Sequence, residues 1–385
     1  MKALRPTLSA AALLALAACA DQTPLATSVD AAAPLLSAQG GRGIDGEYIV
    51  VLESGADPRS VAAVAGIHPK FVYTSALNGF SAALNQGQLN ALRHLPGVAY
   101  VEQDQRADAW TTQTGATWGI DRIDQRSLPL SGTYTYTSTG AGVYAYIIDT
   151  GIQANHPQFG TRAQAVYDYA GGSGADCNGH GTHVSGTIGS TTYGVAKSVQ
   201  LRGVRVMDCN GSGSFSQIIA GVDWVRLNRT NPAVANLSLG GGLSTALNTA
   251  VTSLSNSGVF VAVAAGNSNS DACNYSPASA TAVFTTASSE SNDAKRSTSN
   301  WGSCVDGYAP GGSITSTWIN SGTNTISGSS MASPHVAGVA ALYKATYGNA
   351  SSATIDSWIK TNATANVITG NVAGTPNRLL YKAAL

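Results

Sequence analysis

Short apolar runs and stretches with helical spacing alternate along the chain, and the runs become longer after residue 110. Between residues 44 and 108 the short runs predict strands, and two periodic stretches predict helices, in the order β-α-β-β-α-β. That order is typical of a small ferredoxin-like α+β unit. The expected strands are residues 48–52, 71–74, 80–84 and 98–102, and the expected helices are residues 58–65 and 88–95.

Residues 111–385 contain longer strands that are apolar almost throughout. Such strands, alternating with helices, predict an α/β fold in which helices cover both faces of a parallel sheet. Reactive groups in these sheets gather at the carboxyl ends of the strands. The expected strands are residues 143–148, 199–206, 235–239 and 259–265, and the expected helices include 216–227 and 245–257.

The first twenty residues have the pattern of a secretory signal, with a short basic stretch followed by small apolar residues. Two cleavage alternatives stay open. Residues 16–19 resemble a bacterial lipobox, which would place a lipid on Cys19, whereas Ala18-Cys19-Ala20 also fits ordinary cleavage before Asp21. Residues 21–43 lack periodicity and predict a flexible linker. We therefore expect a secreted protein, and under the first alternative a precursor with a lipid anchor in a bacterial membrane.

The charges balance, with 21 Lys and Arg against 21 Asp and Glu. A nucleic-acid-binding face needs a basic surplus, so no nucleic-acid partner is expected. The sequence also contains no apolar run long enough for a membrane-spanning helix.

Four later cysteines suggest disulfides in an exported chain, although four cysteines allow three connectivities. Pairing sequence neighbours closes two loops of about thirty residues, each contributing roughly 3–4 kcal/mol in the chain-entropy model. The alternative is a zinc site, which the absence of any close C-x-x-C spacing disfavours. The pairs under the first hypothesis are Cys177–Cys209 and Cys273–Cys304.

Three residues at predicted element boundaries carry chemistry together. Asp149 follows an expected strand, His180 opens a helical stretch, and Ser330 precedes a helix without charge until Lys344. Singly, each has an ordinary explanation as a turn cap, a packed histidine or a helix N-cap. Together they supply the nucleophile, the base and the orienting carboxylate of acyl transfer. The other histidines after residue 111 are expected to be structural: His156, His183 and His335.

The sequences around these residues resemble the three catalytic signatures of the subtilase family. They are Y-I-I-D-T-G-I, H-G-T-H-V-S-G-T and G-S-S-M-A-S-P-H-V-A-G, in the order Asp, His, Ser that subtilisin has. The segments W-G-I-D-R-I-D-Q-R, L-S-L-G-G-G and P-N-R-L-L-Y are similar to the proteinase K and aqualysin branch. The resemblance covers residues 111–385. It implies a subtilisin-like fold and a monomeric serine endopeptidase that cleaves proteins or peptides, with broad preference for apolar or aromatic side chains.

Residues 47–104 resemble the propeptide of the same family. This implies a self-processed zymogen whose propeptide, at 44–108, acts as an intramolecular chaperone and inhibitor until it is cleaved. Two alternative functions are disfavoured by the sequence. A catalytically dead subtilase that serves as a binding module would lack a triad or oxyanion residue, and none is missing. An esterase or lipase is disfavoured by the motif order and by Ala332, which breaks the G-x-S-x-G elbow.

The resemblance also assigns roles around the triad. Asn267, after an expected strand, matches the oxyanion donor, although a structural turn would also accommodate asparagine there. Ser329 stands where the family usually has threonine. The walls of the primary specificity pocket are assigned to Ser238, Leu239, Gly240, Ala264 and Gly266. The edge that pairs with extended substrate backbone is assigned to Gly211, Ser212 and Gly213.

Two structural calcium sites are implied in the same way. Hard oxygen ligands suit Ca²⁺, although acidic residues in ordinary turns would look the same. The first site is assigned to Asp121, Asp124, Gln125, Ser131 and Thr133. The second is assigned to Asp306 and the carbonyls of Thr281 and Val283.

Overall fold

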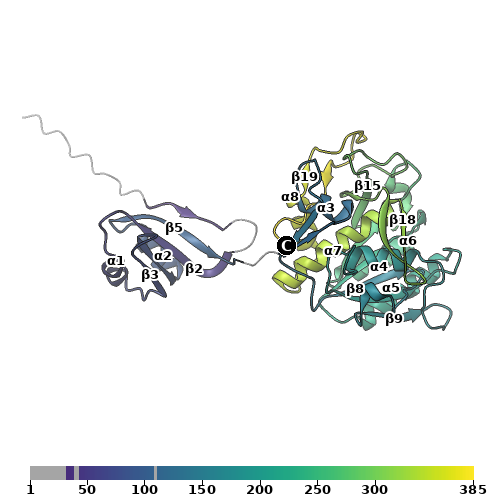
Figure 1. Ribbon diagram of the computed structural model, residues 1–385, viewed down its shortest axis with the longest axis horizontal. Coiled ribbons are helices and arrows are strands. Elements are labelled where there is room, and N and C mark those ends of the chain that lie inside the picture. Colours follow the sequence, from purple (N-terminus) through teal and green to yellow (C-terminus); the bar gives the residue numbers. More distant parts are fainter. Residues whose placement is uncertain (1–31, 39–42, 108–110) are drawn as a thin grey trace, which may run out of the picture. The chain divides into compact units, whose positions relative to one another are not determined.

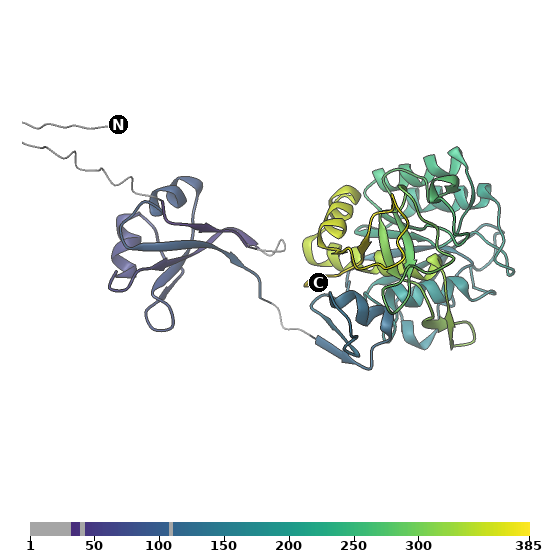
Figure 2. The same ribbon diagram turned by 90° about the horizontal axis from the view of Figure 1, so that it is seen from above.

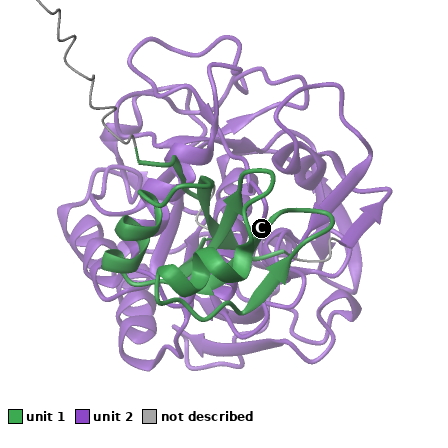
Figure 3. Ribbon diagram, turned by 90° about the vertical axis from the view of Figure 1, so that its left-hand side faces the viewer, with its two compact units in different colours: residues 1–107 green, residues 108–385 purple. Residues whose placement is uncertain are grey.

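The computed structural model describes residues 32–38, 43–107 and 111–385. Over these residues the chain divides into two units, Met1–Ala107 and Asp108–Leu385, which Figure 3 draws in green and purple. Each unit has a hydrophobic core of its own. The predicted signal at residues 1–20, including Cys19, lies outside the described residues.

The N-terminal unit is a five-stranded sheet in the order β1-β5-β2-β4-β3, accompanied by two helices. The side chains of Asp57 and Asn85 accept hydrogen bonds from the first turns of the helices and fix where they begin. Val50, Phe80 and Leu89 are buried in its core, and the expected α+β unit is confirmed. Its elements are β1 (Leu35–Leu36), β2 (Gly43–Leu52), α1 (Pro58–Val64), β3 (Phe71–Tyr73), β4 (Gly79–Ala83), α2 (Gln86–Leu92) and β5 (Val98–Gln105).

The expectation of a flexible linker over all of residues 21–43 is wrong for residues 32–38. Leu35 and Leu36 form β1, which pairs in parallel with β5. The Val101 N–H donates to the Pro34 carbonyl at 2.9 Å, and Ala33 is buried in the core. This strand was missed because main-chain hydrogen bonds to the edge of a sheet need no side-chain periodicity.

The larger unit is built on a nine-stranded sheet in the order β19-β20-β16-β15-β13-β11-β8-β10-β9. All neighbouring pairs are parallel except β19 and β20. The strands are β8 (Tyr144–Asp149), β9 (Ala163–Asp168), β10 (Gln200–Arg205), β11 (Ala233–Leu237), β13 (Phe260–Ala264), β15 (Phe284–Ser289), β16 (Gly307–Pro310), β19 (Thr364–Ala365) and β20 (Arg378–Leu379).

Alternate residues of these strands pack against helices on opposite faces of the sheet (Figures 1 and 2). In β8, Ala145 and Ile147 belong to one core with α4 and α7, whereas Tyr146 and Ile148 belong to another with α5 and α6. Successive side chains of a strand point to opposite faces, so a strand that is apolar throughout is buried on both. The expected doubly covered parallel sheet is confirmed. The helices are α4 (His180–Gly189), α5 (Phe215–Asn228), α6 (Thr245–Asn256) and α7 (Ser329–Tyr347).

Shorter elements surround this framework. None of the helices that the structure describes combines the length and apolarity needed to cross a bilayer. The remaining elements are β6 (Thr111–Thr114), α3 (Trp118–Asp124), β7 (Thr133–Tyr136), η1 (Pro157–Phe159), β12 (Gly241–Gly242), η2 (Ala272–Asn274), β14 (Tyr275–Ser276), β17 (Ile314–Trp318), β18 (Gly322–Ile326) and α8 (Ser352–Asn362).

The four cysteines of this unit form two disulfides between sequence neighbours. Cys177 pairs with Cys209 across a sequence separation of 32, and Cys273 pairs with Cys304 across 31. The pairing hypothesis is confirmed, and the zinc alternative is wrong because all four thiols are consumed.

Candidate active site

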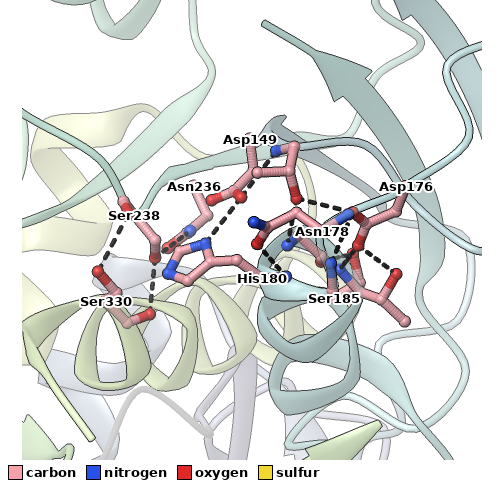
Figure 4. Close-up of polar contacts among 12 residues, drawn as sticks. Asp149, Asp176, Asn178, His180, Ser185, Asn236, Ser238 and Ser330 are labelled. Atoms are coloured by element: carbon pink, nitrogen blue, oxygen red, sulfur yellow. Dashed lines mark hydrogen bonds and ion pairs between the residues drawn. The ribbon is translucent and has the colours of Figure 1, made fainter. Parts of the chain in front are cut away.

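Asp149 and His180 meet at the carboxyl end of β8. His180 Nδ1 lies 2.7 Å from Asp149 Oδ1, which also accepts a hydrogen bond from the Thr150 N–H at 2.8 Å. The Asp149 side chain is fully buried, whereas 26% of the His180 side chain is exposed. Figure 4 shows the imidazole lying between Asp149 and Ser330. The carboxylate therefore holds the ring by one nitrogen and leaves the other available to the cleft.

The pKa of His180 reflects opposing influences. Burial lowers this pKa, but the charge of Asp149, its hydrogen bond to the ring and the charge of Asp176 raise it, and the net pKa lies above the ordinary 6.5. An imidazolium at this position is therefore stabilised by two carboxylates. This environment therefore suits His180 to accept a proton and later release it.

Ser330 is the second residue of α7, so the helix begins one residue before the nucleophile candidate and not after it. The N-cap is Gly328, so the prediction that Ser330 precedes the helix is wrong: Ser330 lies inside its first turn. The Ser330 hydroxyl donates to the Ser238 carbonyl at 3.1 Å. Rotation about the Cβ–Oγ bond of Ser330 frees this proton from Ser238 and turns it toward another acceptor.

A buried chain of hydrogen bonds ties the start of α7 to the end of β11 (Figure 4). Ser333 Oγ donates to Asn236 Oδ1 at 2.7 Å, and Asn236 Nδ2 donates to Ser238 Oγ at 2.8 Å. Ser238 Oγ then donates to the Ser330 carbonyl at 2.7 Å. Asn236 and Ser333 were not predicted from the sequence, because a lone polar residue in an apolar strand or helix carries no motif.

Asn267 lies beside Ser330 with a fixed amide orientation. Its Oδ1 accepts from the Ser329 N–H at 2.8 Å and the Ser329 hydroxyl at 3.2 Å. Ser329 Oγ also accepts from the Gly266 N–H at 3.0 Å. Because Oδ1 is occupied, Nδ2 is the atom left to donate into the cleft that Asn267 lines. Serine at 329 keeps the hydroxyl that this anchoring requires.

One cleft of about 420 Å³ brings most of the assigned substrate residues together. Its lining includes the three catalytic candidates His180, Asn267 and Ser330. It also includes six of the eight assigned substrate residues: Gly211, Ser238, Leu239, Gly240, Ala264 and Gly266. Ser212 and Gly213 are not among its lining residues. Residues that the sequence analysis did not assign also line it, among them Asn178, Met207, Asn210, Tyr275 and Ala278.

The other histidines of the larger unit are held in structural roles. His183 is buried and its Nε2 contacts the carbonyls of Ile314 and Asn324, and burial lowers its pKa to about 4. Burial also lowers the pKa of His335 to about 4. His156 Nε2 lies 3.0 Å from the Gly322 carbonyl. These contacts leave His180 as the histidine beside a serine and a carboxylate.

The residues assigned to the first calcium site gather at one place. Asp121 accepts hydrogen bonds from Ser131 and Gly132, and Gln125 Oε1 accepts from the Ser131 N–H at 3.0 Å. Ser131 Oγ lies 2.8 Å from Thr133 Oγ1. Burial raises the pKa of Asp124 to about 6, and the charge of Asp121 adds to that rise. Two carboxylates, an amide oxygen and two hydroxyls form a set of hard oxygen donors that fits Ca²⁺.

The residues assigned to the second calcium site do not fit a metal ion. Asp306 Oδ1 lies 2.7 Å from the ammonium of Lys360, which also lies 2.8 Å from Asp356. The other Asp306 oxygen accepts from the Thr285 N–H at 2.8 Å, and the Thr281 carbonyl accepts from Thr252 at 2.8 Å. The Lys360 ammonium therefore occupies the Asp306 oxygen that calcium would need. No group of three or more His, Cys, Asp or Glu side chains is arranged for a metal anywhere in the described ranges.

A buried aspartate at the end of a parallel strand contacts a histidine, and this histidine and a serine, each in the first turn of a helix, line one cleft. This is the arrangement of a serine hydrolase. The subtilase family model matches residues 140–379, and the peptidase inhibitor I9 model matches residues 47–109. The chain belongs to the subtilase family of serine proteinases and carries an inhibitor propeptide of the I9 type.

Named relatives agree with this assignment. The extracellular serine proteinase of Thermus sp. (strain Rt41A) is 50% identical over 398 residues, which cover 96% of this chain and 97% of that protein. Proteinase R of Parengyodontium album is 45% identical, with 91% and 92% covered. A crystal structure of a cold adapted subtilisin-like serine proteinase has 51% identity and a TM-score of 0.69, covering 71% of this chain and all of that one.

Proposed function

We propose that the chain hydrolyses internal peptide bonds through an acyl-enzyme formed on Ser330. The observation that carries the proposal is the 2.7 Å contact between Asp149 Oδ1 and His180 Nδ1, beside a cleft that Ser330 also lines. The raised pKa of His180 supports its role as the base. A catalytically dead binding module would have another residue at a triad position or at position 267. This sequence keeps all three triad residues and Asn267.

In the acylation step, the Ser330 hydroxyl turns from Ser238 toward His180 and its oxygen attacks the scissile carbonyl carbon. His180 Nε2 takes the hydroxyl proton and then gives it to the leaving amine as the C–N bond breaks. Water attacks the resulting ester, and His180 takes a proton from this water and returns it to Ser330 Oγ as the acid leaves. Asp149 stays ionised throughout and holds Nδ1–H of the ring.

Negative charge on the tetrahedral intermediate needs donors beside Ser330. Asn267 Nδ2 and the main-chain N–H of Ser330, in the first turn of α7, supply them. The N-terminal end of a helix also favours negative charge through its dipole. Anchoring of Asn267 Oδ1 by Ser329 supports this assignment, because it fixes which end of the amide faces the cleft.

The composition of the cleft supports a preference for apolar or aromatic side chains. Within the part of the chain that the structure describes, no Asp, Glu, Lys or Arg lines it. Ser238 to Gly240 and Ala264 to Gly266 are the residues we assign to two walls of the pocket, and all of them except Leu239 are small, which leaves room for a large apolar group. Gly211 to Gly213, between the cleft and α5, are the residues we assign to pairing with extended peptide backbone.

The inhibitor propeptide supports a zymogen that processes itself near residues 103–108. The relative from Thermus is named extracellular, and the N-terminal pattern of this chain supports secretion for it as well. We also assign one structural calcium ion to Asp121, Asp124, Gln125, Ser131 and Thr133. Bound there, it would neutralise two carboxylates and stabilise the fold, without taking part in the chemistry.

Hydrolysis of casein and of an internally quenched peptide by the purified protein, with Ser330→Ala alongside, tests the proposal. We expect the variant to lose peptide hydrolysis and to retain its propeptide covalently, whereas the wild type releases it. Equal hydrolysis by both proteins would overturn the mechanism. Cleavage of esters without cleavage of peptides would favour the esterase alternative instead.

A further inference from the structure

The carboxylate of Asp176, four residues before His180, accepts five hydrogen bonds. Its Oδ1 accepts from the Thr150 hydroxyl and from the N–H groups of Asn178 and Gly179, each at 2.9 Å. Its Oδ2 accepts from the Thr182 N–H at 2.9 Å and the Thr182 hydroxyl at 2.6 Å. A carboxylate with this many donors is fixed in one orientation.

These bonds hold the two segments that carry Asp149 and His180. Thr150 follows Asp149 at the end of β8, and Thr182 lies in the first turn of α4, two residues after His180. Thr150 Oγ1 also accepts from the Gly181 N–H at 2.9 Å, so it joins the strand end and the helix directly. Figure 4 shows this network on the side of His180 opposite Ser330.

The start of α4 needs such a partner from outside the helix. Its N-cap is Gly179, which has no side chain to cap the first turn and adopts a φ of 110°. A Cβ at this position would clash with the Trp318 ring, so glycine is required there. The N–H groups of the first turn donate to side chains outside the helix instead. The acceptors are Asn178 for the His180 N–H, Thr150 for the Gly181 N–H and Asp176 for the Thr182 N–H.

We propose that Asp176 is a positioning residue, which holds the end of β8 and the first turn of α4 together and so fixes the geometry between Asp149 and His180. This inference rests on the proposed function, because the geometry that it fixes is that of the proposed base. The sequence pattern D-C-N-G-H-G places an acid beside the histidine but does not tell which groups it bonds.

Asp176 also acts on His180 through its charge. The charged groups that raise the His180 pKa are Asp149 and Asp176. His183, one turn further along α4, has a pKa of about 4 and is neutral at working pH. Removal of the Asp176 charge therefore favours the neutral ring. The His180 pKa falls as a result, and the acid limb of kcat/KM moves to lower pH.

Asp176→Asn is the test, because it keeps the shape of the side chain and removes the charge. The new NH₂ group faces backbone N–H donors, so it breaks bonds to α4 or to the loop before it. We expect kcat to fall about 10- to 100-fold with KM nearly unchanged, since a small misplacement of a catalytic group acts on the rate. Thr150→Val is the second variant, because it cuts the link to β8 and leaves the acid in place.

Asp168→Asn is the matched control. Asp168 has a buried carboxylate that fixes a turn, accepting from the Ala170 and Gly174 N–H groups at 2.9 and 3.1 Å, and it lies 3.4 Å from the Arg205 guanidinium, but its bonds do not reach α4. We expect this variant to change stability alone, with kcat and the acid limb as in the wild type. If Asp176→Asn behaves like the control in kcat and in its pH profile, the proposal is overturned.

The His180 pKa is also measured without catalysis, by NMR titration of histidine ring protons in the Ser330→Ala background. A lower His180 pKa on addition of Asp176→Asn supports the role of Asp176, even if the wild-type protein proves not to hydrolyse peptides. An unchanged pKa in this background contradicts it. Peptide hydrolysis by Ser330→Ala, in contrast, overturns the proposed function and not the contact network.

Discussion

Replacing Asn267 tests how the cleft stabilises negative charge. Oδ1 of Asn267 is occupied by the Ser329 N–H at 2.8 Å and by the Ser329 hydroxyl at 3.2 Å. Nδ2 is therefore the atom that faces the cleft. Asn267→Ala removes this donor together with the anchor. Asn267→Asp keeps an acceptor for Ser329 but turns a carboxylate oxygen, instead of an N–H, toward the developing oxyanion.

Loss of one oxyanion donor lowers kcat about 100- to 1,000-fold, which corresponds to ~2.7–4 kcal/mol. We expect Asn267→Ala to fall in this range. KM should stay within about threefold, because the donor acts on charge that develops only after the substrate is bound. Asn267→Asp should be slower still, since two negative charges at short distance repel strongly in a partly desolvated cleft.

The assay is steady-state hydrolysis of a chromogenic peptide by processed protein whose circular dichroism matches the wild type. Asn228→Ala, on the exposed end of α5, is the control and should leave kcat unchanged. A kcat for Asn267→Ala that equals the wild type would refute the assignment. A kcat for Asn267→Asp above that of Asn267→Ala would refute the orientation of the amide.

Four further outcomes follow from the structure. The acid limb of kcat/KM should lie above pH 6.5, because the raised pKa of His180 means that the ring is protonated and inactive below it; peptide hydrolysis from pH 5 to 9 measures this. EDTA should lower the melting temperature of the wild type but not that of Asp124→Asn, as scanning calorimetry would reveal. Lys360→Met should lower stability by about 1–3 kcal/mol, since Asp306 and Asp356 lose their shared cation, which thermal melts of this variant would measure. Replacing Cys273 and Cys304 by serine should remove about 4 kcal/mol for a loop with a sequence separation of 31, measured by denaturant unfolding.

The sequence was a good guide where a pattern extends over many residues. The strand before Asp149 is buried on both faces, and its uninterrupted apolar run predicted that. Strand ends were less certain. The expected strand 235–239 is β11 at Ala233–Leu237, because Ser238 and Leu239 leave the sheet to line the cleft. Apolarity alone does not distinguish a residue in a sheet from one in a pocket wall.

Interactions between distant side chains were beyond the sequence. No motif marks Lys360 in the sequence, yet its ammonium lies against Asp306, far away along the chain. The family resemblance placed calcium at Asp306, because a motif match carries over ligands without regard to residues that compete for them. The network around Asp176 was missed for a related reason, since one carboxylate in a loop has many ordinary uses.

The helix that bears Ser330 has a consequence for the order of events during biosynthesis. Asp149 and His180 leave the ribosome well before α7, because they precede it in the sequence. The same helix fills the centre of the larger core, with Val336, Ala337 and Val339 fully buried. A nascent chain therefore lacks both the proposed nucleophile and the helix at the centre of its core until α7 has been synthesised. The proposed nucleophile and the central helix of this core are therefore added to the growing chain together.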